Sequence, residues 1–344
     1  MRSAKVVLAG SLLALLAGVW PASGQTLTFS LFERYLDSLR EQASIPGMSF
    51  AVIENRAVYG RGLGKQDLES NIAATQDTPY NIAGLSQTLG AAMLLRTCLE
   101  GDSLELSDRV MRWVPQYPDR AATIAQLLTH TVTGQFAYDL DRFAGLTDVI
   151  VECADVQYGY ALTGTVFDPL GMASSAPGSS FDGTPAFGEA TRSRFEDVVR
   201  RMAPAYRVDR GRATRVEMPP ARLSAASGVI SSVMDLARFS NALESGSVVT
   251  AADLDASWTQ ARVQGQPVPT GLGWFVQNYN GEALVWQFGQ VKDGHSALFL
   301  KVPARGLTFI ALANSDGLTA PYNLQNGDAR ESPFAALFLK FFLP

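Results

Sequence analysis

Two stretches of this sequence carry residue types that could bind phosphate or supply a nucleophile. The run GRGLGK (60–65) is rich in glycine and ends in lysine, but it lacks the four-residue spacer and the final Ser or Thr of a phosphate-binding loop. The run GLSQT (84–88) matches two thirds of a nucleophile elbow, but the last glycine, which lets helix and strand pack closely, is absent. The first run therefore indicates a hairpin strand, and the second does not establish a nucleophile.

Histidines and cysteines are scarce. His130 and His295 are too few and too isolated to form a metal cluster, so we predict no metal site and no cofactor. Either histidine could act as a general base, although a structural role is favoured. Cys98 and Cys153 could pair in an oxidising compartment, but the sequence does not place them within bonding reach. We therefore expect two buried free thiols.

The first residues have the pattern of a secretory signal peptide. Arg2 and Lys5 precede an apolar run, residues 6–20, and small residues follow at 22–24. We expect cleavage after about Gly24. The alternative is a membrane anchor, but the run falls short of the roughly 20 apolar residues that span a bilayer. The sequence thus predicts a periplasmic or secreted protein with no stable membrane anchor after cleavage.

Composition bounds the fold and the partners. With 344 residues and 47% hydrophobic content, the chain can bury a large core as one large domain or two interlocked domains. Loss of Arg2 and Lys5 with the signal would change the net charge from −5 to −7. This mild acidity does not favour nucleic-acid binding, which needs a positively charged surface. We expect residues 1–24 to be the signal and residues 25–344 to be the folded body.

Strand-like runs lie at both ends of the chain, and helical patterns lie between them. The runs rich in β-branched and aromatic residues are 48–54, 57–64, 282–288, 296–302 and 307–313. Asn55 and Arg56 separate the first two runs, which indicates a hairpin with a turn at these residues. Phe29, Phe32, Leu36 and Leu39 recur at helical spacing near the start, and residues 332–343 form a closing helix. The pattern predicts an α/β (α+β) fold. Residues 25–80 and 221–344 would build one antiparallel sheet flanked by the first and last helices, with residues 81–220 inserted as a mostly helical region.

Longer motifs occur along the chain in a fixed order. They are TPYNIAGLSQTLG with its continuation (78–115), ATIAQLLTHTVTG (122–134), DPLGM (168–172), LSAASGVISSVMDLARFSNAL (223–243), GLGW (271–274) and VPARGLTFIALANSDGL (302–318). This series resembles the class C β-lactamase and DD-peptidase family of penicillin-recognising serine hydrolases, which also contains many esterases. The resemblance covers nearly the whole mature chain and implies the β-lactamase/transpeptidase-like fold.

The resemblance places the family's nucleophile and base at positions that lack the chemistry. The family uses a serine that opens a helix and a lysine three residues later, so that the ammonium lies beside the hydroxyl. Here the serine position is Gly84, which has no side chain, and the lysine position is Gln87, which is neutral. Ser86 lies about 200° around the helix from Gly84 and should point away from the cleft.

Two further family elements are altered. The segment FAYDL (136–140) is our candidate for the family's Tyr-x-Asn, in which Tyr138 keeps the phenol and Leu140 replaces the asparagine. Tyr138 could instead merely pack between the helical region and the sheet. The strand VWQFG (285–289) occupies the place of the Lys-Thr-Gly triad, so that Gly289 is kept and Gln287 replaces the cationic residue. The resemblance thus implies a cleft lined by Leu140, Gln287 and Gly289.

Two hypotheses follow for function. The favoured one is a pseudoenzyme that binds a peptidoglycan-like peptide, a related small molecule or a protein partner in the old cleft. The other is an active hydrolase of esterase, DD-peptidase or β-lactamase type. Its nucleophile would be Ser86, Ser227 or Ser231, and its base Tyr138, His130 or His295. Ser227 and Ser231 lie in a stretch that begins a helix in the family, so capping is the expected role for both.

Overall fold

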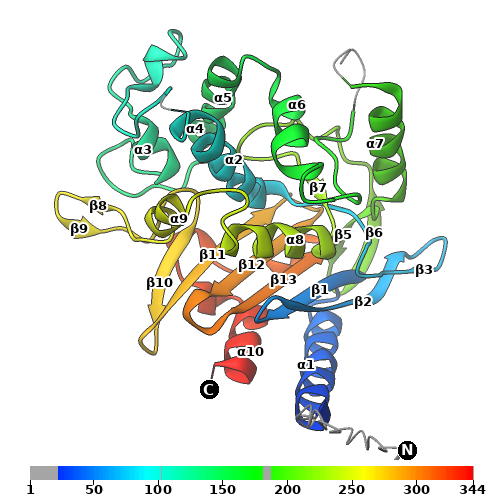
Figure 1. Cartoon of the computed structure of the whole chain (residues 1–344). Coiled ribbons are helices and arrows are strands. Elements are labelled where there is room, and N and C mark those ends of the chain that lie inside the picture. The colour runs from blue at the N-terminus through cyan, green and yellow to red at the C-terminus, as the bar shows by residue number, and fades with distance from the viewer. Residues whose placement is uncertain (1–21, 102, 181–186, 344) are drawn as a thin grey trace, which may run out of the picture.

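A seven-stranded antiparallel sheet forms the centre of the structure (Figure 1). In this computed structural model, residues 22–101, 103–180 and 187–343 are described, together with the side chains from residue 27 onward. The sheet order is β10-β11-β12-β13-β1-β2-β3. Its strands are β1 (Gly47–Glu54), β2 (Ala57–Asp67), β3 (Ile72–Ala73), β10 (Phe275–Tyr279), β11 (Glu282–Gln290), β12 (Ser296–Val302) and β13 (Leu307–Ala313). Because β1 pairs with β13, the two ends of the chain share one sheet, as predicted.

The first hairpin has the predicted turn. Asn55 and Arg56 connect β1 to β2, and both have positive φ values, 49° and 73°. Such a two-residue turn matches the right-handed twist of the paired strands. The run 60–65 lies within β2, so the prediction of a strand in place of a phosphate loop is confirmed.

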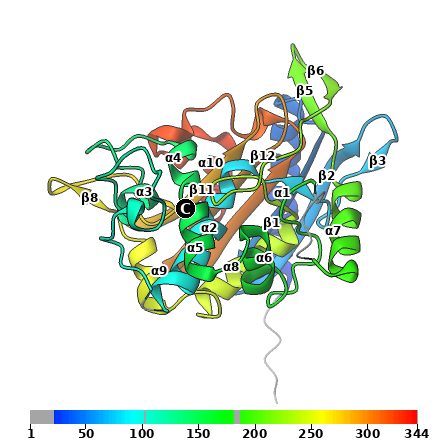
Figure 2. The same ribbon diagram turned by 90° about the horizontal axis from the view of Figure 1, so that it is seen from above.

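The two faces of the sheet are buried by different elements. Side chains alternate along β1, so Phe50 and Val52 join one apolar cluster and Ala51 and Ile53 join the other. The first cluster includes α1 (Ala22–Gln42) and α10 (Pro333–Phe342), which pack against each other and flank the sheet as predicted. Figures 1 and 2 show α8 (Val233–Glu244) across the opposite face, and its contacts are with β1 and β13.

The start of α8 corrects one prediction. Its N-cap is Ser232, whose side chain accepts a hydrogen bond from the Asp235 amide. Ser231 belongs to the short strand β7 (Ile230–Ser231) and Ser227 to the loop before it, so neither caps the helix. Only Ser232 directly precedes the first helical residue with extended backbone, which is the geometry that capping requires.

The remaining helices pack mainly on the face of the sheet that α8 covers. The helices are α2 (Ser86–Leu94), α3 (Ile124–Leu128), α4 (Leu140–Ala144), α5 (Leu146–Ala154), α6 (Tyr158–Leu162), α7 (Glu189–Arg201) and α9 (Ala251–Ser257). Shorter turns are η1 (Ala83–Leu85), η2 (Leu95–Leu99), η3 (Val110–Arg112), η4 (Thr163–Phe167), η5 (Pro303–Arg305), η6 (Asp316–Leu318), η7 (Leu324–Asn326) and η8 (Ala329–Glu331). Small strand pairs are β4 (Tyr80–Asn81) with β7, β5 (Ala205–Asp209) with β6 (Arg212–Val216), and β8 (Arg262–Val263) with β9 (Gln266–Pro267).

The cysteines are not free thiols, which corrects the expectation from the sequence. Cys98 and Cys153 form a disulfide with their Cα atoms 5.8 Å apart. The bond joins η2, the continuation of α2, to α5. The two residues are 55 positions apart, and only the packing of α5 against α2 and η2 brings them together.

Two predictions from the sequence concern membranes and metals. Across residues 22–343, apart from 102 and 181–186, no helix combines the length and apolar character needed to cross a bilayer. The same residues contain no group of three or more His, Cys, Asp or Glu side chains placed to hold a metal ion. The predicted signal segment lies, up to residue 21, outside the described residues.

Candidate functional site

Gly84 lies where the sheet meets the helical region, at the entrance to a buried helix, as predicted. It is the middle residue of η1, which leads directly into α2. The Asn81 side chain shapes this entrance by accepting a hydrogen bond from the Ala83 amide at 2.9 Å. Ala83 adopts a left-handed φ of 48°, which is costly for a residue other than glycine. The backbone before Gly84 is therefore held in a specific, strained path.

The surroundings of Gly84 bring together residues from three distant segments. A Cβ atom at this position would lie 3.2 Å from the Phe288 carbonyl oxygen, 3.2 Å from the Tyr138 hydroxyl and 3.5 Å from Leu140 Cδ2. Tyr138 and Leu140 thus lie beside Gly84. The Tyr138 ring also stacks on Phe288 with ring centroids 5.3 Å apart, so this residue packs against the sheet as well.

Gln87 links Gly84, Tyr138 and His130 in one hydrogen-bond network. Its Nε2 donates to the Gly84 carbonyl at 3.2 Å and to the Tyr138 hydroxyl at 2.8 Å. Its Oε1 lies 2.7 Å from His130 Nε2. On the far side of the imidazole ring, His130 Nδ1 accepts from the Asp139 amide at 3.1 Å. The amide of Gln87 therefore uses its donors and its acceptor at the same time.

Backbone groups at both ends fix the direction of this network. The Asp139 N–H can only donate, so neutral His130 carries its proton on Nε2 and gives it to Gln87 Oε1. The Gly84 carbonyl can only accept, so it faces the NH₂ of Gln87. Tyr138 consequently accepts from Gln87, and its own hydroxyl hydrogen remains available to a group in the space beside Gly84.

Burial keeps the ionisable members of this network neutral. It lowers the pKa of His130 to about 4, against a partly compensating attraction to Asp139. It raises the pKa of Tyr138 well above its ordinary value, and the hydrogen bond from Gln87 offsets only part of that rise. At neutral pH the imidazole is uncharged and the phenol is protonated, so Tyr138 can donate a hydrogen bond but is a poor base.

His295 is also held neutral with both ring nitrogens engaged. Its Nδ1 accepts from the Asn81 amide at 3.3 Å, and its Nε2 bonds to the Ala203 carbonyl at 2.9 Å. Burial lowers the pKa of His295 to about 4. Neither histidine therefore presents a nitrogen that could take a proton from a nucleophile.

The three candidate serines lack a base. Ser86 is fully buried, and its hydroxyl accepts from the Val229 amide at 3.3 Å. Ser231 is also buried and contacts Ser175 at 2.8 Å. Ser227 lines the cavity beside Gly84, and its hydroxyl lies 3.2 Å from that of Ser224. Within the described part of the chain, none of the three hydroxyls forms a hydrogen bond with a histidine, a lysine or a tyrosine.

Two predicted cleft residues on β11 have other positions. Gln287 is fully buried, with Nε2 donating to the Gly273 carbonyl at 3.3 Å and Oε1 accepting from the Phe288 amide at 2.9 Å. A Cβ at Gly289 would lie 2.0 Å from the Ile82 carbonyl oxygen, so this glycine permits η1 to approach the strand. Neither residue lines the cavity, so their predicted place in the cleft is corrected. Leu140 does line it.

One backbone amide of η1 and one of β11 point into the space beside Gly84. In the part of the chain that the structure describes, no group accepts a hydrogen bond from the Gly84 amide. The Val291 amide donates toward β12, to His295, and amide directions alternate along a strand. The Gln290 amide therefore points away from β12 to the side where the Phe288 carbonyl faces Gly84. Two N–H donors thus border the space that a side chain at position 84 would fill.

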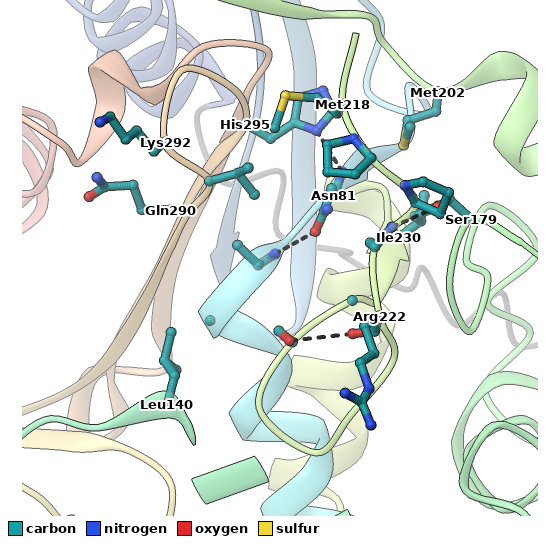
Figure 3. A pocket seen from close by; sticks show the side chains of 18 residues that line it. Asn81, Leu140, Ser179, Met202, Met218, Arg222, Ile230, Gln290, Lys292 and His295 are labelled. Atoms are coloured by element: carbon teal, nitrogen blue, oxygen red, sulfur yellow. Dashed lines mark hydrogen bonds between the residues drawn. The ribbon is translucent and has the colours of Figure 1, made fainter. Parts of the chain in front are cut away.

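A cavity of about 600 Å³ opens beside these amides (Figure 3). Its apolar walls include Met202, Met218, Pro219 and Val291, and Figure 3 shows Lys292 and Arg222 on opposite sides of it. Both cations are exposed, and neither forms an ion pair with any residue that the structure describes. No Asp or Glu is among the described residues that line this cavity.

Most of these residues carry no local signal in the sequence. His130 is a possible base by its residue type, and no motif around it indicates a hydrogen bond with Gln87. Lys292 and Arg222 lie on separate loops, and no motif marks either of them. They could be found only by knowing which loops border Gly84.

The chain matches a family over most of its length. The sequence model of the Beta-lactamase family matches residues 32–332. Among curated proteins, the chain is similar to Protein flp of Staphylococcus aureus, with 31% identity over 98 residues, 26% of this chain and 20% of flp. It is also similar to Esterase EstB of Burkholderia gladioli, with 27% identity over 152 residues, 42% of this chain and 33% of EstB. These matched segments span only about a fifth and a third of the two relatives.

Solved structures share the fold. The octameric penicillin-binding protein homologue from Pyrococcus abyssi aligns with a TM-score of 0.71 at 20% identity, over 84% of this chain and 74% of that chain. The D-stereospecific amidohydrolase from Streptomyces sp. aligns with a TM-score of 0.66 at 19% identity, over 90% and 98%. These likenesses, with the large antiparallel sheet, confirm the predicted β-lactamase/transpeptidase-like fold.

Proposed function

Because the chain belongs to the Beta-lactamase family, we propose that it is a non-catalytic member that binds a small molecule or a peptide in the cavity beside Gly84. One observation carries this proposal. At the helix entrance where the resemblance places the nucleophile, Gly84 offers no side chain, and the neutral side chain of Gln87 takes the position of the base. A covalent acyl intermediate needs an activated nucleophile, which this pair does not supply.

The state of the neighbouring groups supports the same conclusion. A general base must hold an acceptor within hydrogen-bond reach of the proton that it removes. His130 and His295 have both nitrogens engaged, and Tyr138 is a protonated phenol with a raised pKa. Without a charged or basic group beside position 84, the remaining contributions are the two backbone donors and binding in the cavity, and these alone give feeble catalysis.

The cavity supports retained binding. A volume of about 600 Å³ lies in the range of small-molecule sites, and mostly apolar walls with a few polar groups are typical of such sites. EstB is named an esterase and the Streptomyces protein a D-stereospecific amidohydrolase. A peptidoglycan-like peptide or a related small ligand therefore remains our proposal for the occupant.

Covalent probes test the proposal directly. The purified protein should gain no mass after incubation with a fluorophosphonate or a penicillin, measured by intact-protein mass spectrometry beside a serine protease as positive control. Stoichiometric addition on any serine would contradict a non-catalytic role.

The alternative is an active hydrolase with a non-standard nucleophile, and Ser227 favours it because this serine lines the cavity. The same experiment with Ser227→Ala separates the two ideas. An adduct on the unmodified protein that disappears in Ser227→Ala would establish this alternative, and Ser179→Ala serves as a control at another serine of the cavity wall.

We also propose that the protein is exported to the periplasm or secreted. The disulfide between Cys98 and Cys153 supports this, because disulfides persist mainly in oxidising compartments. Fractionation of the producing cell is the test. Recovery of the chain in the cytoplasm with two alkylatable thiols would contradict export.

A further inference from the structure

Three hydrogen-bond donors converge on the space beside Gly84. They are the Gly84 amide, the Gln290 amide and the Tyr138 hydroxyl, whose oxygen lies 3.2 Å from the position of a Cβ at residue 84. The oxygen of Tyr138 is already occupied as an acceptor for Gln87, so only its hydrogen is left for another partner. A group in this space must therefore accept hydrogen bonds.

The absence of a side chain at position 84 changes what these donors can hold. A serine there would place its own hydroxyl oxygen within reach of Tyr138 and would occupy part of the space. No described residue accepts a hydrogen bond from the Gly84 amide. Buried donors without partners are unfavourable, and an ionised oxygen forms stronger hydrogen bonds with them than a neutral one.

The charges around the cavity favour an anion. Arg222 and Lys292 stand on its rim without ion-pair partners among the described residues. Among the described residues, no acidic side chain lines it, and His295 is neutral. Asp141 and Asp148 line a separate hollow, which shares Leu140, Arg222 and Ser227 with this cavity. An anion beside Gly84 would thus meet hydrogen-bond donors in a cavity that carries two cations on its rim.

One group limits where the anion can lie. The Phe288 carbonyl oxygen would be 3.2 Å from a Cβ at position 84, and it repels a negative oxygen. The anion must therefore lie on the side of the Gly84 and Gln290 amides, and the remainder of the ligand extends along Met202, Met218 and Val291. This wall is apolar, so the body of the ligand should be apolar too.

We propose that the cavity binds an ionised carboxylic acid, with its carboxylate on the Gly84 and Gln290 amides and the Tyr138 hydroxyl, and its apolar body against the methionine wall. The inference rests on the proposed function, because it needs a cavity that binds without turnover. A carboxylate is the group that ester or amide hydrolysis releases. In an active enzyme these donors would stabilise the transient negative charge of the reaction. In this chain they hold the permanent negative charge of the bound carboxylate.

Three matched probes test this. 4-Phenylbutanoate, its primary amide and its methyl ester share one apolar body and differ in charge at one end. Isothermal titration calorimetry at pH 7 and low salt should give at least a ten-fold tighter dissociation constant for the acid than for the amide or the ester. Equal affinity for acid and amide, or no binding of any probe at about 10 mM, would overturn the carboxylate site.

Two matched pairs of variants locate the carboxylate. Tyr138→Phe should weaken binding of 4-phenylbutanoate by roughly ten-fold, as expected for a lost hydrogen bond to a charged group, and should change binding of the amide little. Tyr160→Phe, at an exposed tyrosine on α6, should have no effect. Lys292→Gln should weaken binding of the acid by about two-fold to three-fold. Lys340→Gln, at an exposed lysine on α10, should leave binding of the acid unchanged. If Tyr138→Phe matches Tyr160→Phe, the proposed placement is wrong.

Turnover distinguishes this inference from the proposed function. Release of 4-phenylbutanoate from the methyl ester, followed by chromatography, would contradict the non-catalytic role even if the acid still bound best. A lack of turnover together with equal binding of acid and amide would overturn only the carboxylate site.

Discussion

At the scale of single residues, the neutral amide of Gln87 connects three neighbouring groups. Its amide supplies an acceptor to His130 and donors to Gly84 and Tyr138. A lysine ammonium has three donors and no acceptor, so it could satisfy Gly84 and Tyr138 but not the Nε2–H of His130. Because His130 Nδ1 is fixed as an acceptor by the Asp139 amide, the ring cannot simply change tautomer. The neutral network is therefore internally consistent, and a single reversion would disturb it.

If the proposed non-catalytic role is correct, ester hydrolysis should appear when a serine and a lysine are placed at positions 84 and 87. Gly84→Ser with Gln87→Lys puts a hydroxyl and an ammonium one helical turn apart beside two backbone donors. We expect hydrolysis of a p-nitrophenyl ester at roughly ten-fold or more above the unmodified chain, and less activity on a β-lactam, with an acyl adduct at position 84 by mass spectrometry. Gln287→His should add nothing, since residue 287 faces Gly273 and not the cavity.

The double variant should also lose stability. The serine Cβ would lie 3.2 Å from the Phe288 carbonyl oxygen and 3.2 Å from the Tyr138 hydroxyl. The Nε2–H of His130 would lose its acceptor, which should lower the free energy of unfolding by about 1–3 kcal/mol. Gly84→Ala with Gln87→Lys is the matched control, because it carries the same lysine without a hydroxyl. A folded double variant with neither ester hydrolysis nor an adduct would show that the catalytic geometry has been lost along with the side chains.

At the scale of elements, α2 is anchored at both ends. Gln87 and Gly84 tie its beginning to Tyr138 and His130, and the disulfide at Cys98 ties its continuation η2 to α5. The helix between them is buried along its whole length. The cavity therefore borders an element that is held by covalent and hydrogen-bonded contacts to the helical region.

Removal of the disulfide should destabilise the fold without changing the cavity. Cys98→Ser with Cys153→Ser opens a link across 55 residues, and the chain-entropy model assigns such a loop about 4 kcal/mol. Urea denaturation should show a loss of about 2–4 kcal/mol in the free energy of unfolding, and reduction of the unmodified protein should reproduce it. Unchanged unfolding after reduction would contradict a stabilising role for the bond.

At the scale of the whole molecule, two neutral histidines brace the sheet against the helical region. His130 connects the segment after α3 to α2, and His295 connects the turn before β12 to Asn81 and Ala203. In both rings Nδ1 faces a backbone N–H, so protonation would set two donors against each other. The folded state therefore resists protonation of both rings.

Stability should fall as the pH drops below about 6.5. Each histidine has a pKa of about 4 in the folded protein, below its ordinary value of 6.5, so the unfolded chain takes up protons first. The stability that they contribute is present above pH 6.5 and is lost as the pH falls toward 4. By pH 5 the loss relative to pH 7 should be on the order of 2 kcal/mol for each ring.

Urea midpoints at pH 7, 6 and 5 measure this effect. His130→Gln and His295→Gln should each lower stability at pH 7 but flatten the dependence on pH by about half. The raised pKa of Asp235, which burial causes, acts in the opposite direction at lower pH. A midpoint that stays constant from pH 7 to 5 would contradict neutral burial of the two rings.

Local pattern and residue chemistry were enough to predict several features of this protein. Runs rich in β-branched and aromatic residues predicted the strands, the Asn55-Arg56 turn predicted the first hairpin, and the spacing of phenylalanines and leucines predicted the first helix. The identities of residues 84 and 87 also need no structure, because a glycine has no nucleophile and a glutamine has no charge in any conformation.

Which distant groups meet depends on tertiary packing. His130 reaches Gln87 across 43 positions, and Cys98 reaches Cys153 across 55. The direction of Gln287 also depends on packing, because β10 and β11 diverge beyond Trp286 and let that side chain turn to Gly273. Such contacts arise from the packing of whole elements, which no local pattern encodes. The sequence therefore identified glycine and glutamine at positions 84 and 87, and the fold showed how the surrounding groups satisfy one another.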